Sequence, residues 1–93
     1  MARAFYLVSY DISDNRLRTR VAHLLEGYGQ RVQYSVFEIW LSHEEHQALQ
    51  SRLASMVEKE GSVRIYALCA ACCQRIEILG EGEPTDELDL LIL

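Results

Sequence analysis

The chain of 93 residues lacks the features that mark several common protein classes. It has one proline and one tryptophan, and no apolar run approaches the roughly 20 residues that cross a bilayer. The first apolar run is short and carries Arg3 and Asp11, so we expect neither a signal peptide nor a membrane span. The sequence therefore predicts a cytoplasmic protein of one domain.

Cysteine is scarce and is confined to Cys69, Cys72 and Cys73. The C-x-x-C spacing supplies half the ligands of a zinc site, but there is no second such pair and the histidines lie elsewhere. An odd number of cysteines in a chain expected to be cytoplasmic also argues against a disulfide framework. We expect a structural or incidental role for these residues.

Two familiar catalytic and phosphate-binding patterns are also missing. Gly80-Glu81-Gly82 has neither the lysine nor the following helix of a phosphate-binding loop. Ser13 and Ser35 have no histidine at a spacing that supports a nucleophilic pair. Any catalytic chemistry must therefore come from other residues.

The net charge of −5 argues, taken alone, against binding to nucleic acid. The charge is unevenly distributed, however. Residues 1–35 hold five arginines and three carboxylates, whereas residues 36–93 hold four basic and eleven acidic side chains. Guanidinium groups match phosphate oxygens, and a solvated helix face is the alternative for each arginine. The clustering favours phosphate contact by Arg16, Arg18, Arg20 and Arg31.

The first half of the chain predicts a strand followed by a helix. Residues 3–10 are rich in the β-branched and aromatic residues that suit a sheet. Asp14 is expected to cap a helix whose apolar face extends to Tyr28. We expect Gly29 to end this helix as a left-handed cap.

The remaining sequence predicts further strands and a second helix. Residues 31–41 are strongly β-prone, but their apolar alternation changes phase, so the chain must bulge or turn near Tyr34 to Phe37. Ser42-His43-Glu44-Glu45 is a capping box that opens a helix closed by Gly61. This order is typical of an α+β sandwich with both helices on one face of an antiparallel sheet. Further strands are expected over residues 62–68, 74–79 and 88–93.

Asp11 is the strongest candidate for chemistry. It stands where the first strand leaves the core, a poor place for stability and a good one for holding a hard cation. Mg²⁺ prefers carboxylate oxygens and keeps several waters, so one carboxylate per chain suffices when phosphate or a second subunit completes the shell. A simple turn residue is the alternative for Asp11, and for Asp14 we favour the capping role.

Three segments carry a resemblance to a known family. They are Tyr10-Asp11-Ile12-Ser13-Asp14, Arg31-Val32-Gln33-x-Ser35-Val36-Phe37-Glu38 and Val63-Arg64-Ile65-Tyr66-x-Leu68-Cys69-x-x-Cys72. Together they resemble the small CRISPR-associated endoribonuclease family, the non-integrase core subunit of CRISPR adaptation. The similarity spans roughly residues 3–80, and the first two segments in combination are highly specific.

The resemblance implies a ferredoxin-like βαββαβ fold over residues 1–80, with a loop and a C-terminal strand over 81–93 that is exchanged in a homodimer. It implies that Asp11, as catalytic and metal-binding residue, shares Mg²⁺ or Mn²⁺ with its symmetry mate. It also links Arg18, Arg31 and Phe37 to nucleic acid. The full set of expected nucleic-acid contacts is Tyr10, Arg16, Arg18, Arg20, Arg31 and Phe37.

The resemblance implies two functions in spacer acquisition, a part of antiviral defence. The first is a metal-dependent endonuclease that acts on RNA or DNA, with an activity that varies among family members. The second is a non-catalytic scaffold that binds the nucleic-acid backbone and bridges the CRISPR adaptation integrase. A toxin-like ribonuclease of the same fold is a third hypothesis. The segment over residues 31–38 makes this hypothesis less favoured.

Overall fold

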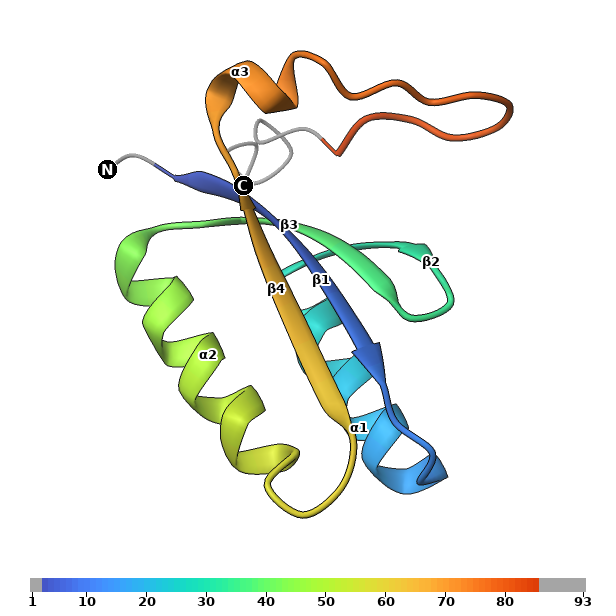
Figure 1. Cartoon of the computed structure of the whole chain (residues 1–93), viewed down its shortest axis with the longest axis vertical. Helices are drawn as coiled ribbons and strands as arrows, with labels where there is room; N and C mark the ends of the chain where they lie inside the picture. Colours follow the sequence, from blue (N-terminus) through green and yellow to red (C-terminus); the bar gives the residue numbers. More distant parts are fainter. Residues whose placement is uncertain (1–2, 86–93) are drawn as a thin grey trace.

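The computed structural model describes residues 3–85 of the chain (Figure 1). Strands and helices follow one another along the sequence in the order β-α-β-β-α-β-α. None of the helices within this range is long and apolar enough to span a membrane. The elements are β1 (Ala4–Asp11), α1 (Asn15–Glu26), β2 (Gly29–Gln33), β3 (Val36–Leu41), α2 (His43–Met56), β4 (Ser62–Leu68) and the short α3 (Ala70–Cys73).

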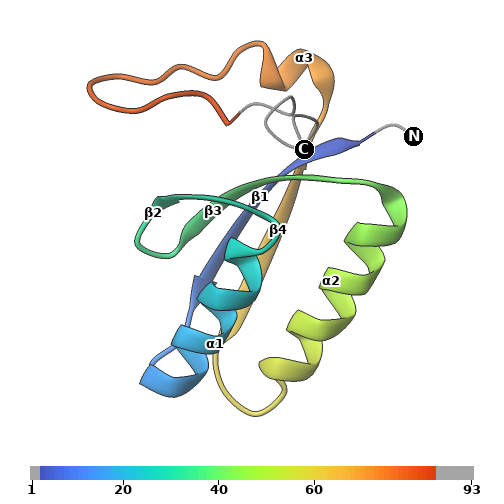
Figure 2. The ribbon, with the colours of Figure 1, turned by 180° about the vertical axis from the view of Figure 1, so that it is seen from behind.

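The strands form one antiparallel sheet in the order β2-β3-β1-β4, so β1 lies between β3 and β4. Both long helices cover the same face of the sheet, as Figure 1 and the reverse view in Figure 2 show. This element order and strand order are those of a ferredoxin-like fold. The predicted α+β architecture is therefore confirmed.

The core lies between the sheet and the two long helices. Successive residues of a strand point to opposite faces, so alternate residues of β1, such as Val8 and Tyr10, meet the helices. Removing this much apolar surface from water is the main favourable term in folding. The buried cluster comprises Val8, Tyr10, Ile12, Val21, Ala22, Leu25, Phe37, Ile39, Leu41, Leu49 and Leu53.

The opposite side of the sheet, which neither long helix covers, is called the open face below. Residues 74–85 leave α3 and lie against part of it. The Trp40 indole N–H donates to the Thr85 carbonyl at 3.0 Å, and the Thr85 hydroxyl donates to Glu38 at 2.6 Å. The strand register assigns to the open face Leu7, Ser9, Asp11, Val36, Glu38, Arg64 and Tyr66.

Several local predictions are confirmed. Asp14 caps α1 by accepting the Leu17 amide at 2.9 Å. Ser42 and Glu45 form both hydrogen bonds of a capping box at the start of α2. The predicted change of phase is a two-residue turn between β2 and β3, preceded by an irregular register between Arg31 and Gln33.

Three local predictions are wrong. Gly61 does not close α2, which ends at Met56 with Val57 as its C-cap, and lies instead directly before β4. Gly29 does not cap α1, which ends at Glu26, and its φ is not positive. It begins β2 instead, where an added Cβ would lie 2.5 Å from the Glu38 carbonyl oxygen, so close strand pairing requires glycine. Residues 74–79 form no strand, since they find no sheet partner among residues 3–85. The strand expected over 88–93 lies outside the described residues.

Candidate functional site

Asp11 is the last residue of the central strand and is exposed on the open face. Its neighbour Tyr10 points into the core, so the alternation of the strand directs Asp11 the other way. The Asp11 side chain forms no ion pair or hydrogen bond with any residue between 3 and 85. Within that range the carboxylate is available to an external cation.

The turn that follows Asp11 is held in place by Arg18. Its guanidinium group donates to the carbonyl oxygens of Ile12 at 2.9 Å and Ser13 at 3.2 Å, and also to the side chain of Asn15. Because these bonds occupy a large part of its donor fork, Arg18 acts mainly as a brace for the turn.

The loop before β4 supports the same turn from the other side. The Glu60 carboxylate accepts the amide N–H of Asp14 at 3.1 Å. Gly61 has a φ of 87°, and an added Cβ would lie 2.8 Å from the Ile12 side chain. Only glycine satisfies both requirements, so this residue fixes the close approach of the loop to the end of β1.

Arg31, Tyr10 and Phe37 form a compact cluster at the edge of the core. The Arg31 guanidinium donates to the Tyr10 hydroxyl at 3.2 Å and lies 5.4 Å from the centre of the Phe37 ring. The hydrogen bond to Tyr10 raises the pKa of Arg31, so its charge persists at every working pH. Glu26 of α1 lies 3.9 Å from the same guanidinium.

Burial changes the interpretation of two residues in this cluster. Phe37 is 0% exposed and Tyr10 is 4% exposed, so neither ring offers a free surface to a base. Direct nucleic-acid contact through Phe37 or Tyr10 is therefore not supported in this conformation. Both residues instead hold the Arg31 guanidinium in place, Phe37 through a cation–π contact and Tyr10 through a hydrogen bond.

The exposed aromatic ring of this region is Tyr34, which is 71% exposed. Its ring centre lies 6.0 Å from the Arg18 guanidinium carbon and 5.9 Å from that of Arg31. The β2–β3 turn thus places one accessible ring beside two cations. The sequence could have predicted this exposure, because Tyr34 lies in the expected turn and turn residues usually face solvent.

Arg16 and Arg20 lie four residues apart on the exposed side of α1. They line a shallow depression together with Asn15 and Thr19. The salt bridges found among residues 3–85 involve neither arginine. Within the described part of the chain, these two guanidinium groups are free to pair with phosphate.

Arg64 joins this site although the sequence pattern alone did not single it out. It pairs in register with Ser9, and therefore lies on the open face two register positions from the pair of Asp11 and Ser62. The neighbouring Tyr66 side chain raises the pKa of Arg64. Apolar and polar residues alternate over residues 62–68, and this pattern could have predicted that the Arg64 side chain points away from the core.

The fit to a metal ion rests on one carboxylate. Among residues 3–85 no three His, Cys, Asp or Glu side chains gather in a group that could hold a metal. Mg²⁺ retains several waters and accepts as few as one or two protein carboxylates beside phosphate oxygens. Asp11 therefore fits as a partial ligand, whose shell a phosphate or a second copy of the chain must complete.

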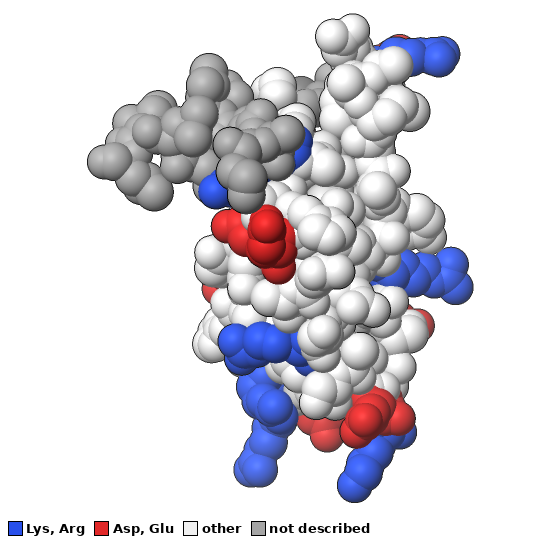
Figure 3. All heavy atoms as spheres, turned by 90° about the vertical axis from the view of Figure 1, so that its left-hand side faces the viewer, with Lys and Arg blue, Asp and Glu red and all other residues white. Residues whose placement is uncertain are grey.

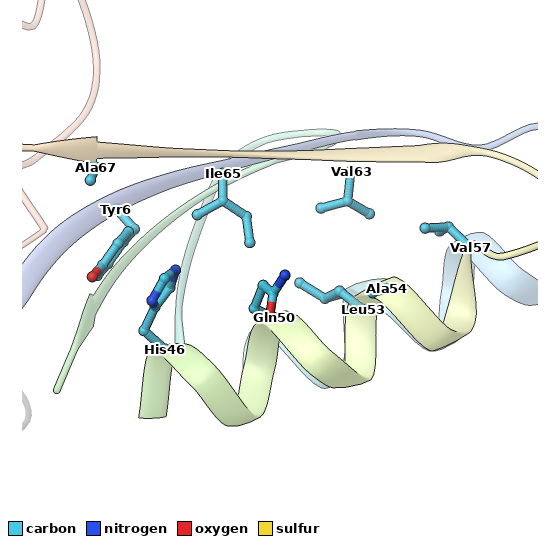
Figure 4. Close-up of a pocket in the computed structure, with 9 residues that line it drawn as sticks. All are labelled: Tyr6, His46, Gln50, Leu53, Ala54, Val57, Val63, Ile65 and Ala67. Atoms are coloured by element: carbon cyan, nitrogen blue, oxygen red, sulfur yellow. The ribbon is translucent and has the colours of Figure 1, made fainter. Parts of the chain in front are cut away.

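A separate groove lies between α2 and the edge strand β4 (Figure 4). Tyr6 stacks on His46 at one end, with ring centres 4.7 Å apart. Figure 3 shows the side of the molecule at the left in Figure 1, where charged side chains are scattered around a largely uncharged middle. The groove is lined by Tyr6, His46, Gln50, Leu53, Ala54, Val57, Val63, Ile65 and Ala67.

The fold and sequence match proteins of CRISPR systems. Residues 4–76 match the family described as CRISPR associated protein Cas2. A relative from Chloroflexus aurantiacus, named CRISPR-associated endoribonuclease Cas2 1, is 49% identical over 88% of this chain and 90% of its own.

Solved structures agree with this match. Streptococcus pyogenes Cas2 superimposes with a TM-score of 0.71 and 36% identity, over 82% of this chain and 99% of that one. A chain in a partial Cas6-RT-Cas1–Cas2 complex gives a TM-score of 0.71 and 26% identity, over 82% of this chain and 90% of that one. The chain belongs to the Cas2 family.

Proposed function

We propose that this chain cleaves phosphodiester bonds in nucleic acid, with Asp11 as its metal-binding and catalytic residue. The observation that carries the proposal is the exposed Asp11 carboxylate, fixed at the end of the central strand and left free by residues 3–85. The endoribonuclease name of the relative from Chloroflexus aurantiacus supports RNA as substrate, and the phosphate-directed side chains suit DNA equally.

Each part of the site has a separate task in this proposal. Asp11 would hold Mg²⁺ or Mn²⁺, which supplies a Lewis acid for the phosphate and an activated water. Arg16 and Arg20 would pair with backbone phosphates, since charge-assisted bonds to phosphate are stronger than neutral ones. Arg18 and Gly61 keep the Asp11 turn in one shape, so the carboxylate needs no reorganisation before the metal binds.

We propose that the active form is a homodimer joined through the open face. Leu7, Val36 and Tyr66 lie on that face without cover from either long helix, and Tyr66 is 47% exposed. Two copies packed face to face would bury these side chains and bring two Asp11 carboxylates toward one axis. The pair would then complete a ligand set that one chain supplies only in part.

Asp11→Asn tests the catalytic assignment. It should lower metal-dependent cleavage of RNA or DNA by roughly 100-fold or more, because an amide no longer offsets the charge of a bound cation. Cleavage is measured on labelled oligonucleotides with Mg²⁺, Mn²⁺ and chelator. Asp14→Asn is the matched control, since asparagine also caps a helix and the same charge is lost.

Wild-type cleavage by Asp11→Asn would refute the assignment, as would a wild-type chain that cleaves nothing with either metal. The second outcome would leave the family's other function, a scaffold that lies along nucleic acid and bridges integrase subunits. The presence of a similar chain in a Cas1–Cas2 complex and the single carboxylate per chain favour this candidate. Spacer acquisition by Asp11→Asn at the wild-type level would then assign the main function to the scaffold.

A further inference from the structure

The three cysteines are not equivalent in space. Cys69 directly precedes the single turn of α3 and Cys72 lies within it; both are exposed, and their sulfur atoms lie 3.3 Å apart. Cys73 is half-buried and directs its thiol to the Leu68 carbonyl oxygen at 3.7 Å. The fold therefore brings the Cys69 and Cys72 sulfur atoms close together and directs the Cys73 thiol elsewhere.

The two paired thiols also differ in acidity. Contacts of the Cys69 sulfur with the backbone and the side chain of Cys72 lower the pKa of Cys69. The same contact raises the pKa of Cys72, and burial raises the pKa of Cys73. An exposed thiol that ionises first beside a protonated thiol is the arrangement of a C-x-x-C redox pair, in which the thiolate is the nucleophile.

We propose that Cys69 and Cys72 form a reversible dithiol–disulfide pair. A disulfide has a sulfur–sulfur bond of about 2.0 Å, so the two sulfur atoms must approach by only about 1.3 Å from their present separation. Both lie on one short turn at the end of β4, where a strand passes into a helix. Side-chain rotation within that turn brings them together.

A small-molecule disulfide is the oxidant in this reaction. The Cys69 thiolate attacks one sulfur of the oxidant, forming a mixed disulfide and releasing one thiolate. Cys72 then gives its proton to solvent and attacks the Cys69 sulfur, which expels the second thiolate of the oxidant. Two protein thiols are oxidised to one disulfide, and one molecule of oxidant is reduced to two thiols.

The position of this pair couples it to the open face. α3 connects β4 to residues 74–85, which reach Trp40 and Glu38 through Thr85 (Figure 1). A disulfide would remove the freedom of the turn from which this segment starts.

The test uses the full chain with oxidised glutathione as the oxidant and a chelator to remove metal ions. After acid quenching and unfolding, free thiols are alkylated and counted by mass spectrometry. Two of the three thiols should be lost, with a peptide cross-link between Cys69 and Cys72, and dithiothreitol should restore them. Three alkylated thiols, or a cross-link that involves Cys73, would overturn the proposal.

Single variants test the assigned order of attack. Cys72→Ser should stop at a mixed disulfide on Cys69, since no second thiol resolves it. Cys69→Ser should lose most of its reaction with the oxidant, whereas Cys73→Ser should form the disulfide as the wild type does. Loss of disulfide formation in Cys73→Ser, or covalent dimers in place of the internal cross-link, would contradict the assignment.

Discussion

Arg18 and Arg31 differ from Arg16 and Arg20 in what their guanidinium groups contact. Arg18 holds the carbonyls of the turn after Asp11, and Arg31 lies over a buried ring. Arg16 and Arg20 form no ion pair with the rest of residues 3–85. We therefore expect Arg18 and Arg31 to maintain the conformation of the site. We expect the other two arginines to bind phosphate through their charge.

The double variant Arg16→Gln/Arg20→Gln should flatten the salt dependence of binding to duplex DNA. Each lost phosphate contact removes about 0.9 from the slope of log affinity against log salt, so the slope should fall by roughly 1.8. Fluorescence anisotropy at several salt concentrations measures this slope. Arg52→Gln/Lys59→Gln removes the same charge from exposed positions on and after α2 and should leave the slope unchanged. Equal slopes for all three proteins would exclude phosphate contact by Arg16 and Arg20.

The site residues differ in how far sequence alone predicted them. The exposure of Asp11 followed from a carboxylate at the end of an apolar run. The position of Phe37 did not, because the change of phase before it left either face of the sheet available. Arg64 could be placed beside Asp11 only once the register between β1 and β4 was known.

The start of α2, at the opposite end of β1 from Asp11, is held by side chains rather than by packing alone. Ser42 accepts the Glu45 amide at 3.2 Å, and the Glu45 carboxylate accepts the Ser42 amide at 2.8 Å. Arg3 lies 3.5 Å from the same carboxylate, which ties the start of the chain to the start of α2. These contacts satisfy amide groups that a helix start otherwise leaves unpaired.

Ser42→Ala should lower the free energy of unfolding by about 1 kcal/mol, the usual cost of losing a helix cap. Urea denaturation followed by circular dichroism measures the change. Ser51→Ala, at an exposed position within α2, should change stability by less than about 0.5 kcal/mol and controls for the loss of a hydroxyl. Equal stabilities of the two variants would contradict a stabilising capping box.

Elements with strong local signals were predicted closely. The strand over 62–68 has its predicted bounds, and the capping box starts α2 where expected. Gly29 was misread because a glycine required for close strand approach looks the same in sequence as one required for positive φ. Ile76 and Ile78 alternate as in a strand, yet they line a cavity with Phe5 and Trp40 and gain no strand partner among the described residues.

The whole molecule has two unlike sides. One side buries the core beneath both long helices, and the open face carries apolar residues that neither helix covers. A chain of 93 residues has little interior to spare, so apolar surface left on a sheet favours association. The proposed homodimer gives that surface a partner.

Tyr66→Lys should weaken the dimer, because it would bury an unpaired ammonium in the interface. Such burial costs several kcal/mol, so the dissociation constant should rise by roughly 100-fold or more. Sedimentation velocity over a range of concentrations measures the change, with circular dichroism to show that the variant folds. Gln47→Lys adds the same charge at an exposed position of α2 and should leave the dimer intact.

A Tyr66→Lys chain that dimerises as tightly as the wild type would exclude the open face as the interface. A wild-type chain that sediments as a monomer at all concentrations would exclude the dimer itself. Either result would leave Asp11 without a second carboxylate from a partner and would turn attention to phosphate oxygens as the remaining ligands.

The position of β1 between two strands determines how the Asp11 site can unfold. β1 is hydrogen-bonded to β3 on one side and to β4 on the other, and Asp11 itself pairs with Ser62. Such a strand cannot detach locally, because its amide groups open only when most of the sheet opens. A ligand bound at Asp11 would therefore protect the entire domain against heat and proteases, rather than merely ordering one loop.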